Sequence, residues 1–161
     1  MGSTGISNSG KAASMKTLAS ALYRLALALW TGGAALFTFV LTPAIFASFD
    51  RDRAGEVVGA LFPGYFRWGL ITGAVALVCL LLKDRPAPKL KVSVLLAMLA
   101  LVSVQAFYVE PRAAELKKRI PSFVTTPADD PERAEFRKLH GISMGMNLGV
   151  LAGGAVLILL P

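Results

Sequence analysis

The C-terminal stretch from Phe136 to Leu160 constrains the fold of this chain more than any other part. No charged side chain follows Lys138, and the apolar run that begins there is long enough to cross a membrane. A hydrocarbon core of about 30 Å needs about 20 helical residues. We therefore predict a final membrane-spanning helix over residues 140–160.

Three further apolar runs precede it, at about residues 18–41, 64–82 and 91–109. Of the 161 residues, 55% are hydrophobic and only 17% are charged, whereas about 25% are charged in an average soluble domain. This composition predicts an all-α fold, an integral membrane four-helix bundle, with one domain over residues 16–161. Residues 1–15 are rich in Gly and Ser and are predicted to be a disordered leader or tag.

The segments between the runs predict shorter helical pieces. Pro43 is expected to kink or end the first span, because proline removes a backbone donor. Residues 54–62 have apolar residues at amphipathic spacing, which predicts a short interfacial helix after the first span. Between the third and fourth spans we expect water-exposed helical extensions, one over residues 112–119 after Pro111 closes the third span, and one starting at Pro131.

The formal net charge of +7 comes from basic residues at the ends of the apolar runs. This placement indicates membrane topology and attraction to anionic lipid rather than nucleic-acid binding. Four spans put both termini on one side, and we expect a bacterial inner membrane with both termini cytoplasmic. The expected partners are the lipid bilayer and either a second copy of the chain, in a homo-oligomer, or a membrane partner protein, with no nucleic acid.

Six glycines in the apolar runs stand at four-residue intervals. They are Gly69 and Gly73 in the second run and Gly141, Gly145, Gly149 and Gly153 in the last run. Small residues at this spacing are typical of helices that pack closely in a membrane. We predict that all six lie at helix–helix contacts.

Three polar side chains share one face of the last run. His140, Ser143 and Asn147 stand three and four residues apart, and helical periodicity brings them onto one side. An amide inside the bilayer costs free energy unless another helix satisfies it. Asn147 is therefore expected to have a partner on a neighbouring span.

The first span offers the other wall of a pocket. Thr38 and Thr42 lie at the depth of Asn147, and the kink expected at Pro43 opens space opposite them. We predict a polar pocket at one membrane interface. Thr38, Thr42 and Pro43 of the first span line it on one side, and the three polar side chains of the last run line it on the other. In the third span, Gln105 reaches either another helix or the lipid head groups.

His140 is the sole histidine and has three interpretations. It is a structural residue bonded to a nearby carbonyl or hydroxyl, a residue lining the pocket, or a haem or metal ligand. A copper site would also recruit Met144, which shares its helix face, but not Met146. Cys79, the one cysteine, lies in an apolar run and is predicted to be a small buried hydrophobe.

Motifs of conventional enzymes are missing from the sequence. It contains no P-loop, no dinucleotide-binding fingerprint and no paired carboxylates in the apolar runs. We therefore expect a non-enzymatic membrane protein without a cofactor, which binds a small ligand, a lipid or a partner protein in the polar pocket. The alternative is a redox or metal-handling membrane protein that uses haem or copper, with His140 as a ligand.

Three separated motifs follow one another along the chain. The first consists of Trp30, Gly32, Phe37, Pro43 and Phe46. The second consists of Ala54, Gly55, Val57, Phe62, Pro63, Tyr65 and Phe66. The third consists of Phe136, Leu139, His140, Ser143 and Asn147. Together they resemble the transmembrane protein 205-like family. The resemblance covers residues 18–160 and implies a small four-helix membrane domain, classed in bacteria as a domain of unknown function, without supplying a reaction.

Overall fold

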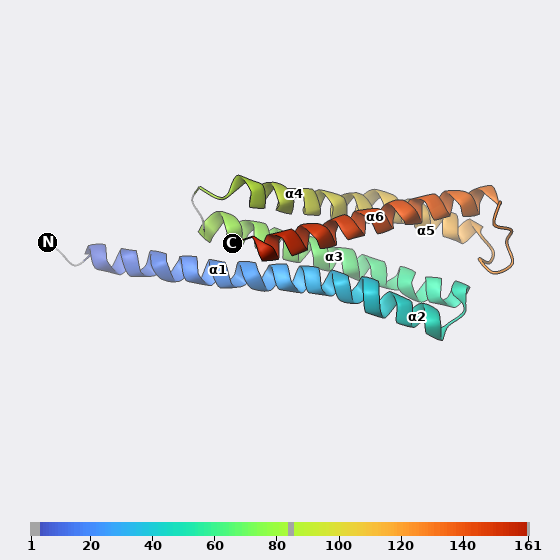
Figure 1. Ribbon diagram of the computed structural model, residues 1–161, viewed down its shortest axis with the longest axis horizontal. Helices are drawn as coiled ribbons and strands as arrows, with labels where there is room; N and C mark the ends of the chain where they lie inside the picture. Colours follow the sequence, from blue (N-terminus) through green and yellow to red (C-terminus); the bar gives the residue numbers. More distant parts are fainter. Residues whose placement is uncertain (1–3, 84–85, 161) are drawn as a thin grey trace.

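The computed structural model describes residues 4–83 and 86–160, and every element within them is helical (Figure 1). The elements are α1 (Thr4–Leu36), η1 (Phe37–Leu41), α2 (Thr42–Ser48), α3 (Arg51–Lys83), α4 (Lys89–Val104), η2 (Gln105–Val109), α5 (Glu110–Arg119) and α6 (Pro131–Leu159). The two elements named η are π-helical turns. The prediction of an all-α four-helix bundle is confirmed.

Four continuous helical stretches are each long and apolar enough to cross a membrane, as an integral membrane protein requires. They are Gly10–Ser48, Arg51–Lys83, Lys89–Arg119 and Pro131–Leu159. Around the bundle α1 contacts α3, α3 contacts α4, α4 contacts α6, and α6 closes the ring on α1. The 33 residues of α3 extend about 50 Å, more than a hydrocarbon core of about 30 Å. The α3 helix is therefore longer than the hydrocarbon core is thick.

The first helix begins earlier than predicted. α1 starts at Thr4, so residues 4–15 of the segment predicted to be a disordered leader or tag are helical, while residues 1–3 lie outside the described part. Helices elongate at little cost once nucleated, and the long first span supplies that nucleus. Figure 1 shows this end of α1 extending past the other helices, at the same end of the bundle as the C-terminus.

The short interfacial helix expected over residues 54–62 is not a separate element, because these residues form the start of α3. Their apolar face packs against α2 instead of lying in lipid. Ala54, which is 0% exposed, and Val58, which is 6% exposed, form a cluster with Ile45. Pro63 lies within the continuous α3 helix.

Neither Pro43 nor Pro111 ends its helix, which is contrary to expectation for Pro111 and excludes one of the two outcomes, an end or a kink, expected for Pro43. Each is the second residue of a helix that continues directly from a π-helical turn. The N–H of Thr42 bonds to the carbonyl of Phe37, and that of Glu110 to the carbonyl of Gln105, both five residues back. A wider turn relieves the clash and the missing donor that proline imposes on the preceding turn. Both spans consequently run on past their prolines.

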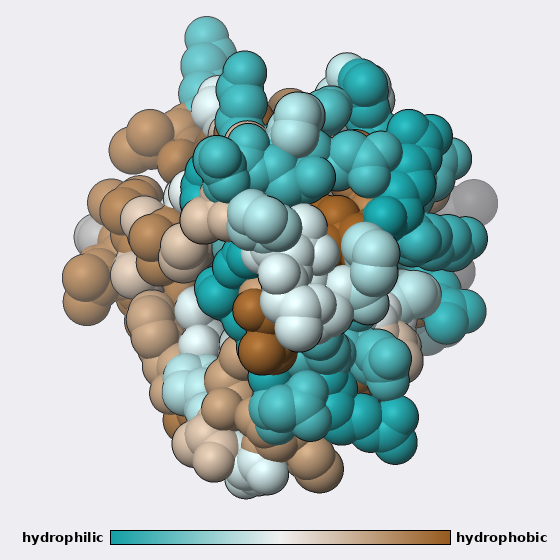
Figure 2. All heavy atoms as spheres, turned by 90° about the vertical axis from the view of Figure 1, so that its right-hand side faces the viewer, coloured by the Kyte–Doolittle hydropathy of each residue, from teal (hydrophilic) through white to brown (hydrophobic). Residues whose placement is uncertain are grey.

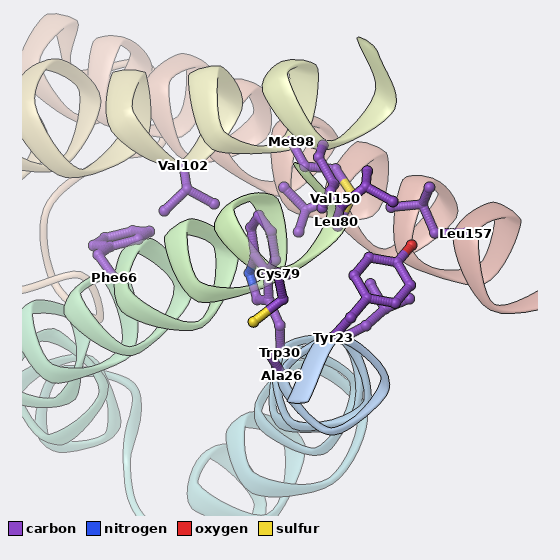
Figure 3. Packing of buried hydrophobic residues seen from close by; sticks show 13 residues of the cluster. Tyr23, Ala26, Trp30, Phe66, Cys79, Leu80, Met98, Val102, Val150 and Leu157 are labelled. Carbon is purple, nitrogen blue, oxygen red and sulfur yellow. The ribbon is translucent and has the colours of Figure 1, made fainter. Parts of the chain in front are cut away.

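A cluster of buried apolar side chains from all four spans fills the bundle (Figure 3). Trp30 of α1, which is 2% exposed, lies among residues of α3, α4 and α6. The members with the least exposed surface are Ala76, Leu80, Leu95, Met98 and Val150. Cys79 is 6% exposed and belongs to the same cluster, as predicted.

The end of the bundle opposite the termini is polar. Figure 2 shows this end, where hydrophilic residues cover much of the surface and apolar residues lie along one flank. The loop of residues 120–130 joins α5 to α6 here, and Asp130 caps α6 by accepting from the N–H of Arg133 at 3.0 Å. The predicted helix start at Pro131 is confirmed.

Asp52, in the first turn of α3, holds this loop. Its carboxylate accepts from the hydroxyl of Ser122 at 2.5 Å and from the backbone N–H of Phe123 at 2.6 Å. The two helix connections at the polar end are therefore tied together.

Candidate functional site

The side chain of Asn147 joins three spans. Its amide nitrogen donates to the hydroxyl of Thr38 at 2.6 Å, and its amide oxygen accepts from the hydroxyl of Tyr65. Thr38 lies in η1 and Tyr65 in α3, so α6 is bonded to both members of the first hairpin. The partner predicted for Asn147 on the first span is present.

A second interhelical bond lies one helical turn away on α6. The hydroxyl of Ser143 donates to the side-chain oxygen of Gln105 at 3.1 Å. Gln105 is 2% exposed, and its amide nitrogen also donates to the carbonyl of Leu101 at 3.4 Å. Of the two interpretations left open for Gln105, contact with another helix is the one observed.

We call Thr38, Tyr65, Gln105, Ser143 and Asn147 the polar row. The two residues on α6 supply its centre, and each of the other three spans contributes one partner. Burial inside a membrane makes such bonds costly to leave unmade. The row is therefore a hydrogen-bonded network between helices.

Both π-helical turns lie at the polar row. Thr38 is the second residue of η1, and Gln105 is the first residue of η2. Each turn precedes a proline, so the two prolines set the backbone that carries these side chains. π-helical turns inside α-helices occur frequently at functional sites.

Aromatic rings surround Tyr65. Its ring stacks on Phe37 with centroids 4.5 Å apart and meets the edge of Phe66 at 5.3 Å. The ring centroid of Phe62 lies 5.8 Å from that of Phe37, so Phe62 extends the aromatic cluster toward the polar end. These contacts fix the direction of the phenol hydroxyl. The sequence analysis names Tyr65 only as a motif residue, and it missed the bond to Asn147.

The other predicted pocket residues do not join the row. His140 is exposed and stacks on Phe136 with centroids 6.2 Å apart. Pro43 is exposed, and Thr42 is half-buried in α2. Neither of two cavities, one lined by residues of α5 and α6 and one by residues of α1 and α3, includes any of the six pocket candidates.

The metal alternative would rest on a small donor set. Met144, the partner expected for His140, is 51% exposed. Across residues 4–83 and 86–160, no three His, Cys, Asp or Glu residues gather as metal ligands would. Among the described residues, the donors expected for such a site are therefore His140 and, for copper, Met144.

The six predicted packing glycines differ in their surroundings. A Cβ at Gly141 or Gly145 would meet nothing within 4 Å, so the first half of the stripe is not at a helix contact. A Cβ at Gly149 would lie 3.1 Å from Leu101, and one at Gly153 would lie 2.8 Å from Met98. Only the second half of the stripe therefore faces α4.

Two glycines of α3 pack against an indole ring rather than against the backbone of another helix. A Cβ at Gly69 would lie 3.1 Å from the ring nitrogen of Trp30, and one at Gly73 would lie 2.6 Å from its ring carbon Cζ3. Gly154, which is off the stripe, lies against Thr31 of α1. Helix spacing alone did not separate these cases, because it does not say which neighbour a face meets.

Comparisons with known proteins identify the family of the chain. Residues 25–122 match the family described as a domain of unknown function (DUF4149). An uncharacterized protein of Aquifex aeolicus (strain VF5) is 36% identical over 142 residues, which cover 85% of this chain and 96% of that protein. No solved structure matches the chain.

Proposed function

The chain belongs to the DUF4149 family, and from that premise we propose that it is a non-enzymatic membrane protein whose polar row binds the polar group of a small ligand or lipid. The ligand would replace one or more of the interhelical hydrogen bonds of the row. A partner protein that inserts a polar side chain would use the same groups.

The observation that carries the proposal is the bonding of Asn147. One amide serves two other helices at once, as donor to Thr38 and as acceptor from Tyr65. The row offers more polar groups than one interhelical bond requires, namely two hydroxyls, a phenol and two amides. Donors and acceptors that converge in an apolar setting are typical of ligand sites.

The two π-helical turns support the same proposal. A π-helical turn costs more than α-helix and persists where it serves a purpose. Here both turns direct a polar side chain toward α6.

The finer assignments belong to this proposal. We place the chain among transmembrane protein 205-like proteins, in a bacterial inner membrane with both termini cytoplasmic. No cofactor takes part in the proposed binding. Self-association in the bilayer is compatible with the exposed apolar faces, which otherwise contact lipid.

The test compares Asn147→Ala with Ser103→Ala. Ser103 is a matched control because its hydroxyl donates at 2.8 Å to the carbonyl of Leu99 within its own helix. Native mass spectrometry of each purified protein in mild detergent measures the molecules retained from the membrane. We expect a retained molecule in the unchanged protein and in Ser103→Ala, and its loss in Asn147→Ala at normal membrane level. Retention by Asn147→Ala contradicts the proposal.

The haem or copper alternative is tested on the same samples. A Soret band or stoichiometric copper that disappears in His140→Gln would establish it. We expect neither signal, since the proposal places binding at the polar row and not at His140.

A further inference from the structure

Thr38 and Asn147 carry hydrogen-bond donors that the polar row leaves unused. A hydroxyl has one donor hydrogen, and a side-chain amide has two. Asn147 gives one amide hydrogen to the hydroxyl oxygen of Thr38 at 2.6 Å. Across residues 4–83 and 86–160, the bonds of these two side chains use neither the hydroxyl hydrogen of Thr38 nor the second amide hydrogen of Asn147. Two donors on different spans therefore remain for a ligand.

The unused donors call for a ligand with acceptor oxygens. The hydroxyls of Tyr65 and Ser143 already donate to amide oxygens of the row. The amide of Gln105 also keeps one hydrogen, but Gln105 is only 2% exposed and is closed off from a ligand. One amide hydrogen of Asn147 points at Thr38, so the other points away from it, and the two unused donors reach separate oxygens. In an apolar setting an unused donor costs free energy, which a ligand with two carbonyl oxygens would recover.

The surroundings of these donors disfavour a charged ligand group. The row itself consists of hydroxyl, phenol and amide groups. On α6 the last charged residue is Lys138, nine residues before Asn147 and about 13 Å away along the helix axis. Arg67 comes two residues after Tyr65, so it points to the opposite side of α3, where it donates to the carbonyl of Pro63 at 3.1 Å. A charged group bound at the row would stay unpaired in an apolar setting.

An apolar edge of α6 adjoins the two donors. Thr38 and Asn147 are half-buried, whereas Gln105 is sealed in the bundle. Met144, three residues before Asn147, is 51% exposed, and Leu151, four residues after it, is half-buried. Spacings of three and four residues put both side chains beside Asn147 on one edge of the helix. Apolar chains attached to the carbonyl groups would lie along this edge.

We propose that the ligand of the polar row is a diacylglycerol, an uncharged glycerolipid whose ester carbonyl oxygens accept from Thr38 and Asn147. This inference rests on the function proposed above and adds the chemical class of the ligand. A diacylglycerol supplies two ester carbonyls close together, two apolar chains and no charge. A phospholipid supplies the same esters, but its phosphate lies only a few bonds away and would be drawn into the apolar zone. The carboxylate of Glu110, five residues after Gln105, would repel that phosphate.

The test compares dioleoylglycerol with its diether analogue, in which methylene groups replace both ester carbonyls. Native mass spectrometry of the full chain in detergent, titrated with each lipid, gives the two affinities. We expect the unchanged protein to bind the diester about tenfold more tightly, because two hydrogen bonds are added. This preference should disappear in Asn147→Ala and persist in Ser103→Ala, whose hydroxyl bonds within its own helix.

Equal affinity of the unchanged protein for the diester and the diether overturns this inference, and that measurement needs no folded variant. The proposed function would still stand in that case if Asn147→Ala loses the molecule retained from the membrane. A diester preference that persists in folded Asn147→Ala also overturns the inference, because the carbonyls would then bind elsewhere. Dioleoylphosphatidylglycerol is the remaining comparison, and tighter binding of this phospholipid than of dioleoylglycerol overturns the choice of an uncharged lipid.

Discussion

The indole ring of Trp30 occupies the space that a side chain at Gly73 would need, with a Cβ there only 2.6 Å from ring carbon Cζ3. The relationship is reciprocal between the two helices. Trp68 of α3 lies against Gly33 of α1, and its ring N–H donates to the carbonyl of Leu29 at 3.2 Å. In the first hairpin, a tryptophan of each helix therefore packs against a glycine of the other helix.

We predict that Gly73→Ala destabilises the bundle. The rigid indole cannot move aside as a flexible side chain would, so overpacking should cost about 1 to 3 kcal/mol. Gly145→Ala is the control, because a Cβ at that position meets nothing within 4 Å. It should instead stabilise by about 0.5 to 1 kcal/mol, the usual advantage of Ala over Gly in a helix. Thermal unfolding midpoints measured in detergent test this prediction. Equal shifts of the midpoint in the two variants would contradict it.

The bond between Asn147 and Thr38 should appear as a coupling energy. Asn147→Leu leaves the hydroxyls of Thr38 and Tyr65 without this partner and is expected to cost about 1 to 3 kcal/mol. Thr38→Val removes one of those stranded groups. The double variant should therefore be less destabilised than the sum of the singles, by about 0.5 kcal/mol or more. Additive losses in a double-mutant cycle would show that the bond contributes nothing.

Topology can be read from two labelling sites. Ser14 and Thr125 are exposed near opposite ends of the bundle, and Cys79 is buried and can be replaced by Ala. In sealed vesicles an impermeant thiol reagent should label only one of Ser14→Cys and Thr125→Cys. Labelling of both from the same side would mean an even number of crossings between them and would contradict the three spans described here.

The carboxylate of Asp52 should protect the loop between α5 and α6. Asp52→Ala removes the acceptor for Ser122 and for the N–H of Phe123, so trypsin should cleave near Arg119 and Arg133 sooner. Asp129→Ala, an exposed position in the same loop, is the control. The rates of limited proteolysis in detergent measure the effect, and the prediction fails if the two variants are cleaved alike.

The existence and approximate placement of the spans could be predicted because a long apolar run has few alternatives to a membrane helix. The helix boundaries could not. Pro43, Pro63 and Pro111 are strong breakers in isolation, yet tertiary packing and two wider turns carry the helices through them. A proline preference is a local property, and the bundle overrides it.

The candidate site was predictable only in part, for a related reason. The expected depth in the bilayer predicted Thr38 as a partner of Asn147, because an amide at that level must be hydrogen-bonded, and the structure shows this bond. The direction in which a side chain points around its helix was harder to predict. His140 is predicted to share a helix face with Asn147 but is exposed, while Tyr65 contributes a bond that the sequence pattern did not predict. Which side of a helix meets a neighbour depends on the arrangement of all four spans.

The tie between Asp52 and Ser122 also bears on how the chain assembles during synthesis. The two residues are 70 positions apart, so the carboxylate leaves the ribosome well before its partner. Asp52 must stay hydrated while the third span is inserted, and the bond can close only after the chain has crossed the membrane again and delivered the loop. Closure of this contact thus marks the late stage at which the second hairpin docks onto the first, and amide protection at Phe123 would time that step.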